Sequence, residues 1–141
     1  MQQKARIRFE WREGLALVCA LGRGALDSDP QAKSLSVRGL IHMAACRRAG
    51  GAEALERLGR RAKDRLLAEE TKATRSALTR LGDLGLVVWG YSDDNDELAY
   101  RLTELGWETA VRFGRQLVRD RQAAQAKSVG RQEGVAIAGP A

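Results

Sequence analysis

The spacing of apolar residues along the chain predicts a mainly helical protein. Over Trp11–Leu26 the apolar and small residues that recur at intervals of three and four form the pattern of one buried helix face: Trp11, Leu15, Val18, Gly22 and Ala25. The segment Asp27–Pro30 ends this helix, because proline cannot continue it. A second helix is expected to begin with Ser34 or Ser36 as its N-cap and to end at Gly50–Gly51, which tolerates a left-handed cap. Its apolar stripe comprises Val37, Leu40, Ile41 and Ala44.

The segment after Gly51 is also helical in pattern, but the number of helices stays open. Residues 52–70 form either one helix or two short helices that separate near Gly59 or Lys63. A further helix is expected from about Thr71 to Leu84, with Thr71 or Thr74 as its N-cap. The choice decides which helix lies directly before the helix expected over about 71–84.

From Leu86 onward the pattern becomes typical of strands. Leu86–Trp89 is rich in β-branched and aromatic residues. Ser92–Asp96 consists of Asp, Asn and Ser, whose side chains bond to their own backbone and favour a turn. Residues 98–102 are expected to return as the second strand. The sequence therefore predicts a β-hairpin over about 86–102.

A last helix is expected to begin after Thr103, which is a good N-cap, with Glu104 favourably placed in the first turn. Its apolar stripe comprises Trp107, Ala110, Val111, Gly114, Leu117 and Val118. After Gln122 the residues are small and polar. We therefore expect a single domain over 1–126 and a flexible C-terminal tail over 127–141.

Helices followed by a two-stranded hairpin are the arrangement of a winged helix-turn-helix domain. Residues 78–106, LTRLGDLGLVVWGYSDDNDELAYRLTELG, resemble MarR-type winged helix-turn-helix transcriptional regulators. The resemblance covers the end of the recognition helix, the wing and the start of the following helix. The matching residues are Leu78, Leu81, Gly85, Leu86, Val87, Leu102, Thr103, Glu104 and Gly106.

The resemblance implies an assembly and a function. In that family the first and last helices of two chains interlock into a dimer, and here both helices carry an apolar stripe with a glycine, Gly22 and Gly114. We therefore expect a homodimer that binds double-stranded DNA through a recognition helix over about 71–84. Such a protein is a transcriptional regulator, here a repressor that occupies its operator and excludes polymerase. The alternative is that both stripes pack within one chain.

The charge distribution agrees with a DNA-binding protein. The chain of 141 residues has 24 basic and 18 acidic side chains, and most of the surplus lies in residues 1–70. No acid falls between Thr71 and Leu81. The candidate recognition residues are Lys72, Arg75, Ser76, Thr79 and Arg80, and the candidate phosphate contacts are Arg57, Arg60, Arg61 and Lys63. The alternative is that these arginines only form a solvated helix face.

The tip of the hairpin departs from the family pattern. Family members usually carry an Asp-x-Arg pattern there, whereas Ser92–Glu97 has four acids and no base. DNA phosphate would repel such a tip. The alternative function is therefore a winged-helix adaptor or inhibitor, from a phage or mobile element, that contacts another protein through its acidic wing.

The composition argues against most enzymes. His42 is the one histidine, and no phosphate-binding glycine loop, nucleophile elbow or zinc spacing is present. We therefore expect no catalytic site, metal or cofactor. Cys19 and Cys46 are typical of buried thiols in a reducing compartment, and no apolar run is long enough to span a bilayer. These features predict a cytoplasmic protein with no membrane partner.

Overall fold

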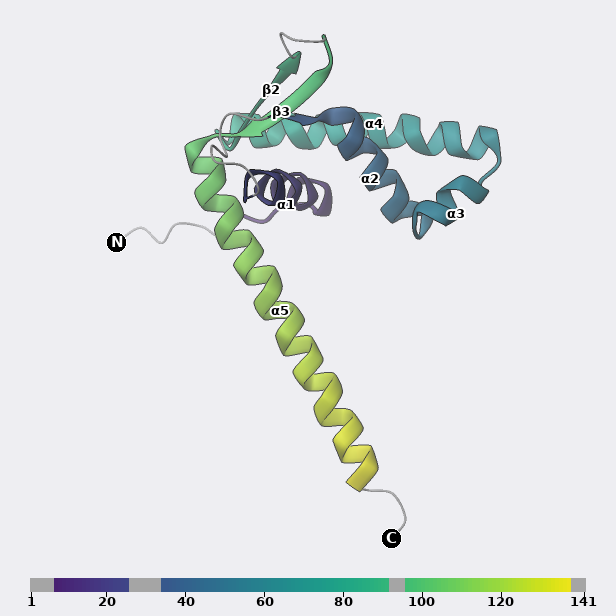
Figure 1. Ribbon diagram of the computed structural model, residues 1–141, viewed down its shortest axis with the longest axis vertical. Helices are drawn as coiled ribbons and strands as arrows, with labels where there is room; N and C mark the ends of the chain where they lie inside the picture. The colour runs from purple at the N-terminus through teal and green to yellow at the C-terminus, as the bar shows by residue number, and fades with distance from the viewer. Residues whose placement is uncertain (1–6, 26–33, 92–95, 138–141) are drawn as a thin grey trace.

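The structure of the protein is a computed structural model that describes residues 7–25, 34–91 and 96–137 (Figure 1). This part of the chain is mainly helical, with one small sheet, as the sequence predicts. In chain order the elements are α1 (Trp11–Ala25), β1 (Leu35–Ser36), α2 (Val37–Ala49), α3 (Ala52–Arg57), α4 (Arg60–Asp83), β2 (Val87–Tyr91), β3 (Leu98–Leu102) and α5 (Glu104–Ile137).

Helices α1, α2 and α4 pack against one another, and strands of the sheet contact all three of them. Helix α5 begins beside the sheet and packs along α1. It then extends away from the rest of the molecule (Figure 1). The sequence predicted an end for this helix near Gln122, which is wrong because α5 continues to Ile137.

The sheet has three antiparallel strands in the order β1-β3-β2. Strands β2 and β3 form the predicted hairpin, with Val87 opposite Leu102 and Trp89 opposite Tyr100. The two-residue strand β1 pairs with the other edge of β3, where Leu35 lies opposite Tyr100. Sequence patterns did not indicate β1, because two residues are too few for a detectable alternation.

The core lies where α1, α2, α4 and the sheet meet. Tyr100 is buried at its centre, and its hydroxyl donates a hydrogen bond of 2.9 Å to the carbonyl oxygen of Ala16. Burial raises the pKa of Tyr100 well above its ordinary range, so the phenol stays protonated. Other core members include Leu17, Val37, Leu40, Leu78, Leu81, Leu86 and Leu102.

Helix α1 buries a different face from the one that its apolar spacing suggests. Ala16, Leu17 and Ala20 are buried, whereas Val18 and Gly22 are exposed. Helix α1 packs against α5 of the same chain, and each of the two helices has a glycine at this contact. A Cβ at Gly14 would lie 2.6 Å from the Phe113 ring, and one at Gly114 would lie 3.4 Å from Leu21.

The caps of α2 agree with the sequence prediction. The Ser36 hydroxyl accepts a hydrogen bond of 3.4 Å from the backbone N–H of Gly39, and Gly50 ends the helix with φ of 98°. The region that follows resolves into the short helix α3 and the long helix α4, separated at Gly59.

The predicted helix start near Thr71 is therefore wrong. Thr71 and Thr74 both lie inside α4, so neither is an N-cap. The Thr71 hydroxyl donates to the carbonyl oxygen of Leu67 at 2.7 Å, and Thr74 is buried. No helix-breaking residue lies between Arg60 and Thr71, so the helix continues through the expected boundary.

The connections at both ends of the hairpin, from α4 into β2 and from β3 into α5, depend on glycine. Gly85 has φ of 75° and turns the chain from α4 into β2. The Thr103 hydroxyl accepts a hydrogen bond of 3.0 Å from the N–H of Gly106, as expected of an N-cap. Gly106 lies so close to the residue before β2 that an added Cβ would lie 1.7 Å from the carbonyl oxygen of Leu86.

Gly106→Ala should therefore lower the free energy of unfolding by about 3 kcal/mol or more, because a methyl group there meets backbone that cannot move cheaply. Gly22→Ala is the matched control. It also lies in a helix, but an added Cβ meets nothing within 4 Å. It should raise stability by about 0.5–1 kcal/mol. Urea unfolding monitored by circular dichroism measures both, and equal effects of the two substitutions would contradict the proposed close contact.

Candidate nucleic-acid interface

The outward face of α4 carries most of the residues predicted to bind DNA. Because α4 is continuous over Arg60–Asp83, residues seven positions apart lie on one face, about two turns from each other. Arg65, Lys72 and Thr79 follow this spacing and are exposed. The opposite face carries the buried residues of the helix, which are Glu70, Thr74, Ala77, Leu78 and Leu81.

A shallow hollow along this surface brings the predicted recognition residues together. It is lined by Ala68, Thr71, Lys72, Arg75, Ser76, Thr79, Arg80 and Asp83. Asp83 is the acidic member of this set, and it lies at the last turn of the helix. We define the α4 face as the exposed residues Arg61, Arg65, Lys72, Arg75, Ser76 and Thr79.

Arg75 also borders a second hollow, between the start of α2 and the hairpin. This hollow is lined by Val37, Arg38, Ile41, Arg75, Tyr91, Asp96, Glu97 and Leu98. The α4 face therefore lies beside both the first turn of α2 and the hairpin.

The predicted phosphate contacts do not form one cluster. Lys63 turns toward α3, where its ammonium group lies 3.0 Å from Glu56. Arg57 lies on α3, highly exposed and 3.9 Å from Glu53. Arg60 and Arg61 are exposed in the first turn of α4. Of this group, Arg61 alone shares the α4 face.

Sequence analysis missed Arg65 as a candidate site residue. Arg65 lies seven residues before Lys72, so both belong to one face only if the helix continues between them. The predicted helix start near Thr71 concealed this relation. The seven-residue spacing of Arg65, Lys72 and Thr79 is the signal that points to it.

The acidic tip of the hairpin is only partly described by the structure. Ser92–Asn95 lies outside the described residues. Asp96 has φ of 51° and is exposed. The carboxylate of Glu97 accepts a hydrogen bond of 2.8 Å from the Ser36 hydroxyl, which links the hairpin to the start of α2.

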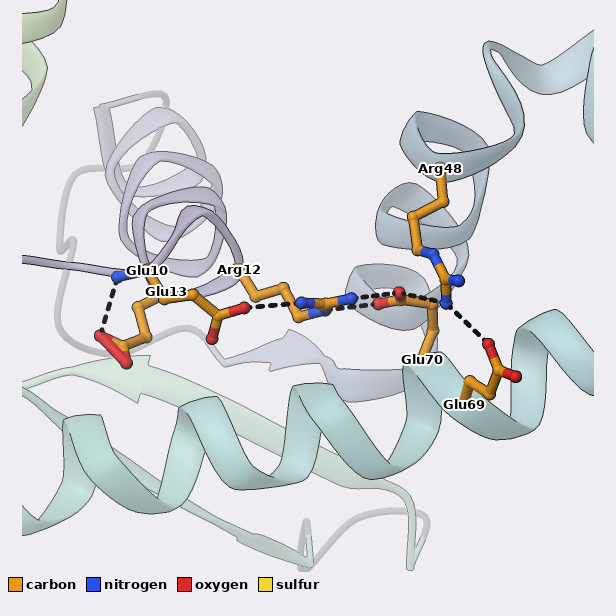
Figure 2. A network of polar contacts seen from close by, with 6 residues as sticks. All are labelled: Glu10, Arg12, Glu13, Arg48, Glu69 and Glu70. Carbon is orange, nitrogen blue, oxygen red and sulfur yellow. Dashed lines mark hydrogen bonds and ion pairs between the residues drawn. The ribbon is translucent and has the colours of Figure 1, made fainter.

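A buried carboxylate lies behind the α4 face. Glu70 is fully buried and accepts hydrogen bonds from Arg12 of α1, from Nε at 2.8 Å and from Nη2 at 2.6 Å. Arg48 of α2 approaches the same carboxylate at 3.1 Å and also contacts Glu69 at 3.1 Å. Figure 2 shows this network, which extends through Arg12 to Glu10. One carboxylate of α4 thus contacts both α1 and α2.

The two arginines keep Glu70 ionised. The hydrogen bonds from Arg12 lower the pKa of Glu70 below its ordinary value, and those from Arg48 act in the same direction. Burial opposes this shift but does not outweigh it. The same contact raises the pKa of Arg12. The network therefore remains charged at neutral pH.

A second ion pair joins α1 to the C-terminal part of α4. Arg80 donates from Nη1 to Oε2 of Glu13, which is buried. The same nitrogen lies 3.3 Å from the carbonyl oxygen of Arg8. Arg80 therefore differs from the other predicted recognition residues, because its guanidinium is paired within the chain.

His42 and Cys46 lie one helical turn apart on α2. The thiol of Cys46 lies 3.7 Å from His42 Nδ1 on the exposed side of α2. Among the described residues, no group of three or more His, Cys, Asp or Glu side chains is placed to hold a metal ion. None of the helices over the same residues combines the length and apolar character needed to cross a bilayer.

Comparisons of this chain with protein families, curated proteins and solved structures found no match.

Replacing Glu70 tests the importance of the buried network. Glu70→Ala should lower the free energy of unfolding by about 3 kcal/mol, since it leaves the guanidinium of Arg12 without its buried partner. Glu69→Ala is the matched control, because Glu69 also contacts Arg48 but is exposed, and it should cost less than about 1 kcal/mol. Urea unfolding at pH 7 distinguishes the two.

The ionised Glu70 and its arginine partners also predict a pH dependence of the free energy of unfolding. Because the folded-state pKa of Glu70 is lowered, its contribution to stability is present at neutral pH. It is lost as the pH falls below about 4.3, the ordinary value of a glutamate, and through the folded-state value. The stability difference between the wild type and Glu70→Gln should therefore shrink on acidification. A constant difference from pH 7 to pH 3 would contradict an ionised Glu70.

Proposed function

We propose that this protein is a winged helix-turn-helix regulator that binds double-stranded DNA through α4. The observation that carries the proposal is the α4 face, an exposed basic surface beside a β-hairpin, in which the stretch from Lys72 to Arg80 contains no acid. On this view the protein acts in the cytoplasm by occupancy of DNA, as a transcriptional repressor, and has no catalytic activity or cofactor.

The topology supports this proposal. A helix, a short strand, further helices and a hairpin follow one another, and the first strand pairs with the last in the order β1-β3-β2. In such an arrangement α4 is the recognition helix and β2–β3 is the wing. Gly85 and Thr103 are two of the residues that carry the MarR-type resemblance. They have the turning and capping roles that the resemblance implies, which supports the proposal.

The chemistry of the α4 face suits a duplex. An α-helix fits the major groove, and an exposed arginine can donate two parallel hydrogen bonds to guanine. Arg75 and Lys72 lie at the centre of the face, with the hydroxyl groups of Ser76 and Thr79 beside them. Arg61 and Arg65 lie about two to four turns from this centre, toward the N-terminus. We assign them to the phosphates that flank the groove.

We also propose that the regulator is a homodimer formed through the distal part of α5. The side chains over Arg115–Val129 are all exposed, and they include the apolar residues Leu117, Val118 and Val129. Apart from Val18 and Leu105, the large apolar side chains of α1 and of the first part of α5 pack within one chain instead. A second copy of α5 is the natural partner for the exposed segment, because a two-fold dimer matches a palindromic DNA site.

Fluorescence anisotropy with a labelled random-sequence duplex tests DNA binding. We expect salt-dependent binding that Lys72→Ala combined with Arg75→Ala weakens by roughly tenfold near 0.1 M salt. Binding to a random-sequence duplex is carried by the phosphates, so both cations should contact the backbone there, and the double variant should reduce the slope of log K against log salt by about 1.8, at about 0.9 for each lost contact. If neither residue contacts phosphate directly, the loss should instead appear as reduced discrimination between sequences.

The control replaces two exposed arginines outside both the α4 face and the distal α5, Arg23→Ala of α1 combined with Arg112→Ala of the first part of α5. It removes the same charge away from the α4 face and should leave affinity nearly unchanged. Equal weakening by both double variants would show that binding is not localised on α4. No binding even at low salt would refute the proposal and favour the protein-binding adaptor, whose partner would be sought by pull-down.

Sedimentation velocity tests the dimer. The wild type should sediment as a dimer at micromolar concentration, and Leu117→Glu combined with Val118→Glu should convert it to a monomer. Leu105→Glu is the control, because Leu105 is also an exposed apolar residue of α5 but lies at its first turn. A monomeric wild type would exclude the proposed interface.

A further inference from the structure

Among the predicted recognition residues that the structure describes, Arg80 is paired with a buried acid, Glu13. Its Nη1 group donates to Oε2 of Glu13 and to the carbonyl oxygen of Arg8. The Glu13 side chain is 5% exposed, whereas that of Arg80 is 46% exposed. The pair therefore connects a buried carboxylate of α1 to a guanidinium that reaches the surface of α4.

This pairing leaves one edge of the guanidinium unused. Arginine has a rigid, planar fork of five N–H groups. Nη1 has both of the partners described above, while Nε and Nη2 have no hydrogen-bond partner among the described residues. Nε and Nη2 carry two parallel N–H groups, which match two oxygens of a phosphate. Arg80 also lines the same hollow as Lys72, Arg75 and Thr79.

We propose that Glu13 is a positioning residue for DNA binding, which orients Arg80 so that its free edge contacts a backbone phosphate beside the α4 face. The proposal rests on the function proposed above and adds a residue of α1 to it. Glu13 itself is buried and does not contact DNA. Its carboxylate fixes the rotamer of Arg80 before binding, so less side-chain entropy is lost when the phosphate arrives.

The proposal predicts that replacing Glu13 changes DNA affinity in the direction opposite to that expected from net charge alone. Removing an acid from a DNA-binding protein raises its positive charge, which by itself strengthens binding. If Glu13 positions Arg80, its removal instead weakens binding despite the added charge. The direction of the change therefore separates a positioning role from a mere charge effect.

The experiment measures anisotropy of a labelled duplex over a range of salt concentrations for the full chain and its variants. Glu13→Gln keeps the shape of the side chain but removes its charge. We expect it to weaken binding about three- to tenfold and to reduce the salt slope by about 0.9, the value of one phosphate contact. Arg80→Lys should have a similar effect, because one ammonium group cannot contact Glu13 and present a two-pronged edge as well.

The combined variant, Glu13→Gln with Arg80→Lys, should bind no more weakly than either single variant, because both remove the same contact. Glu53→Gln is the matched control. Glu53 is an exposed acid of α3, 3.9 Å from Arg57, so its removal should leave affinity unchanged or slightly increased. Thermal unfolding confirms that each variant is folded at the assay temperature, and the salt slope reports a lost contact independently of stability.

Three outcomes are decisive. Weaker binding with a reduced slope for Glu13→Gln supports the proposal. Equal or tighter binding for Glu13→Gln, while Lys72→Ala with Arg75→Ala still weakens binding, overturns this inference and leaves the proposed function intact. Absence of salt-dependent binding by the wild type overturns both.

Discussion

The packing of this protein depends on one buried carboxylate, that of Glu70. A carboxylate without water around it is costly unless its charge and its lone pairs are satisfied. Arg12 of α1 and Arg48 of α2 both donate to Glu70, so its burial requires the three helices to meet at one point. The apolar core supplies most of the stabilisation by area, but apolar contacts alone allow several relative orientations of helices. The ion pairs select one of them.

Neighbouring residues of α1 contact α4 at two separate places. Arg12 pairs with Glu70, and Glu13 pairs with Arg80, ten residues further along α4. Ten residues of helix correspond to about 15 Å. Two contacts at that separation fix both the position and the direction of α4. The acids that make these contacts lie on the buried side of α4 or beneath it, which leaves the outward side free to be basic.

Local features of the structure were predictable from sequence, whereas partners far apart in the chain were not. The caps Ser36, Gly50 and Thr103 depend on residues within four positions, and the structure confirms them. The hairpin is also local, because its strands are joined by a few turn residues. Strand β1 pairs with residues more than 60 positions away, so its two residues gave no signal.

The candidate site shows the same division. The exposed positions of Lys72, Arg75, Ser76 and Thr79 agree with the sequence prediction, since helical spacing alone determines a shared face. The pairing of Arg80 with Glu13 spans 67 residues and depends on how α1 packs against α4. Thr74 illustrates a further limit. Threonine is common at N-caps, yet this one is buried in mid-helix, because no breaker precedes it.

If the exposed distal part of α5 binds a second copy, helix formation in this segment and association become a single equilibrium. An isolated helical segment of about 15 residues is marginal in water, because its backbone hydrogen bonds barely offset the loss of chain entropy. No side chain over Arg115–Val129 is buried within the chain. Helix formation over these residues therefore gains its stability from whatever covers them. If a second copy does so, the helical content of this segment rises with protein concentration, and dilution melts it while the domain around Glu70 stays folded.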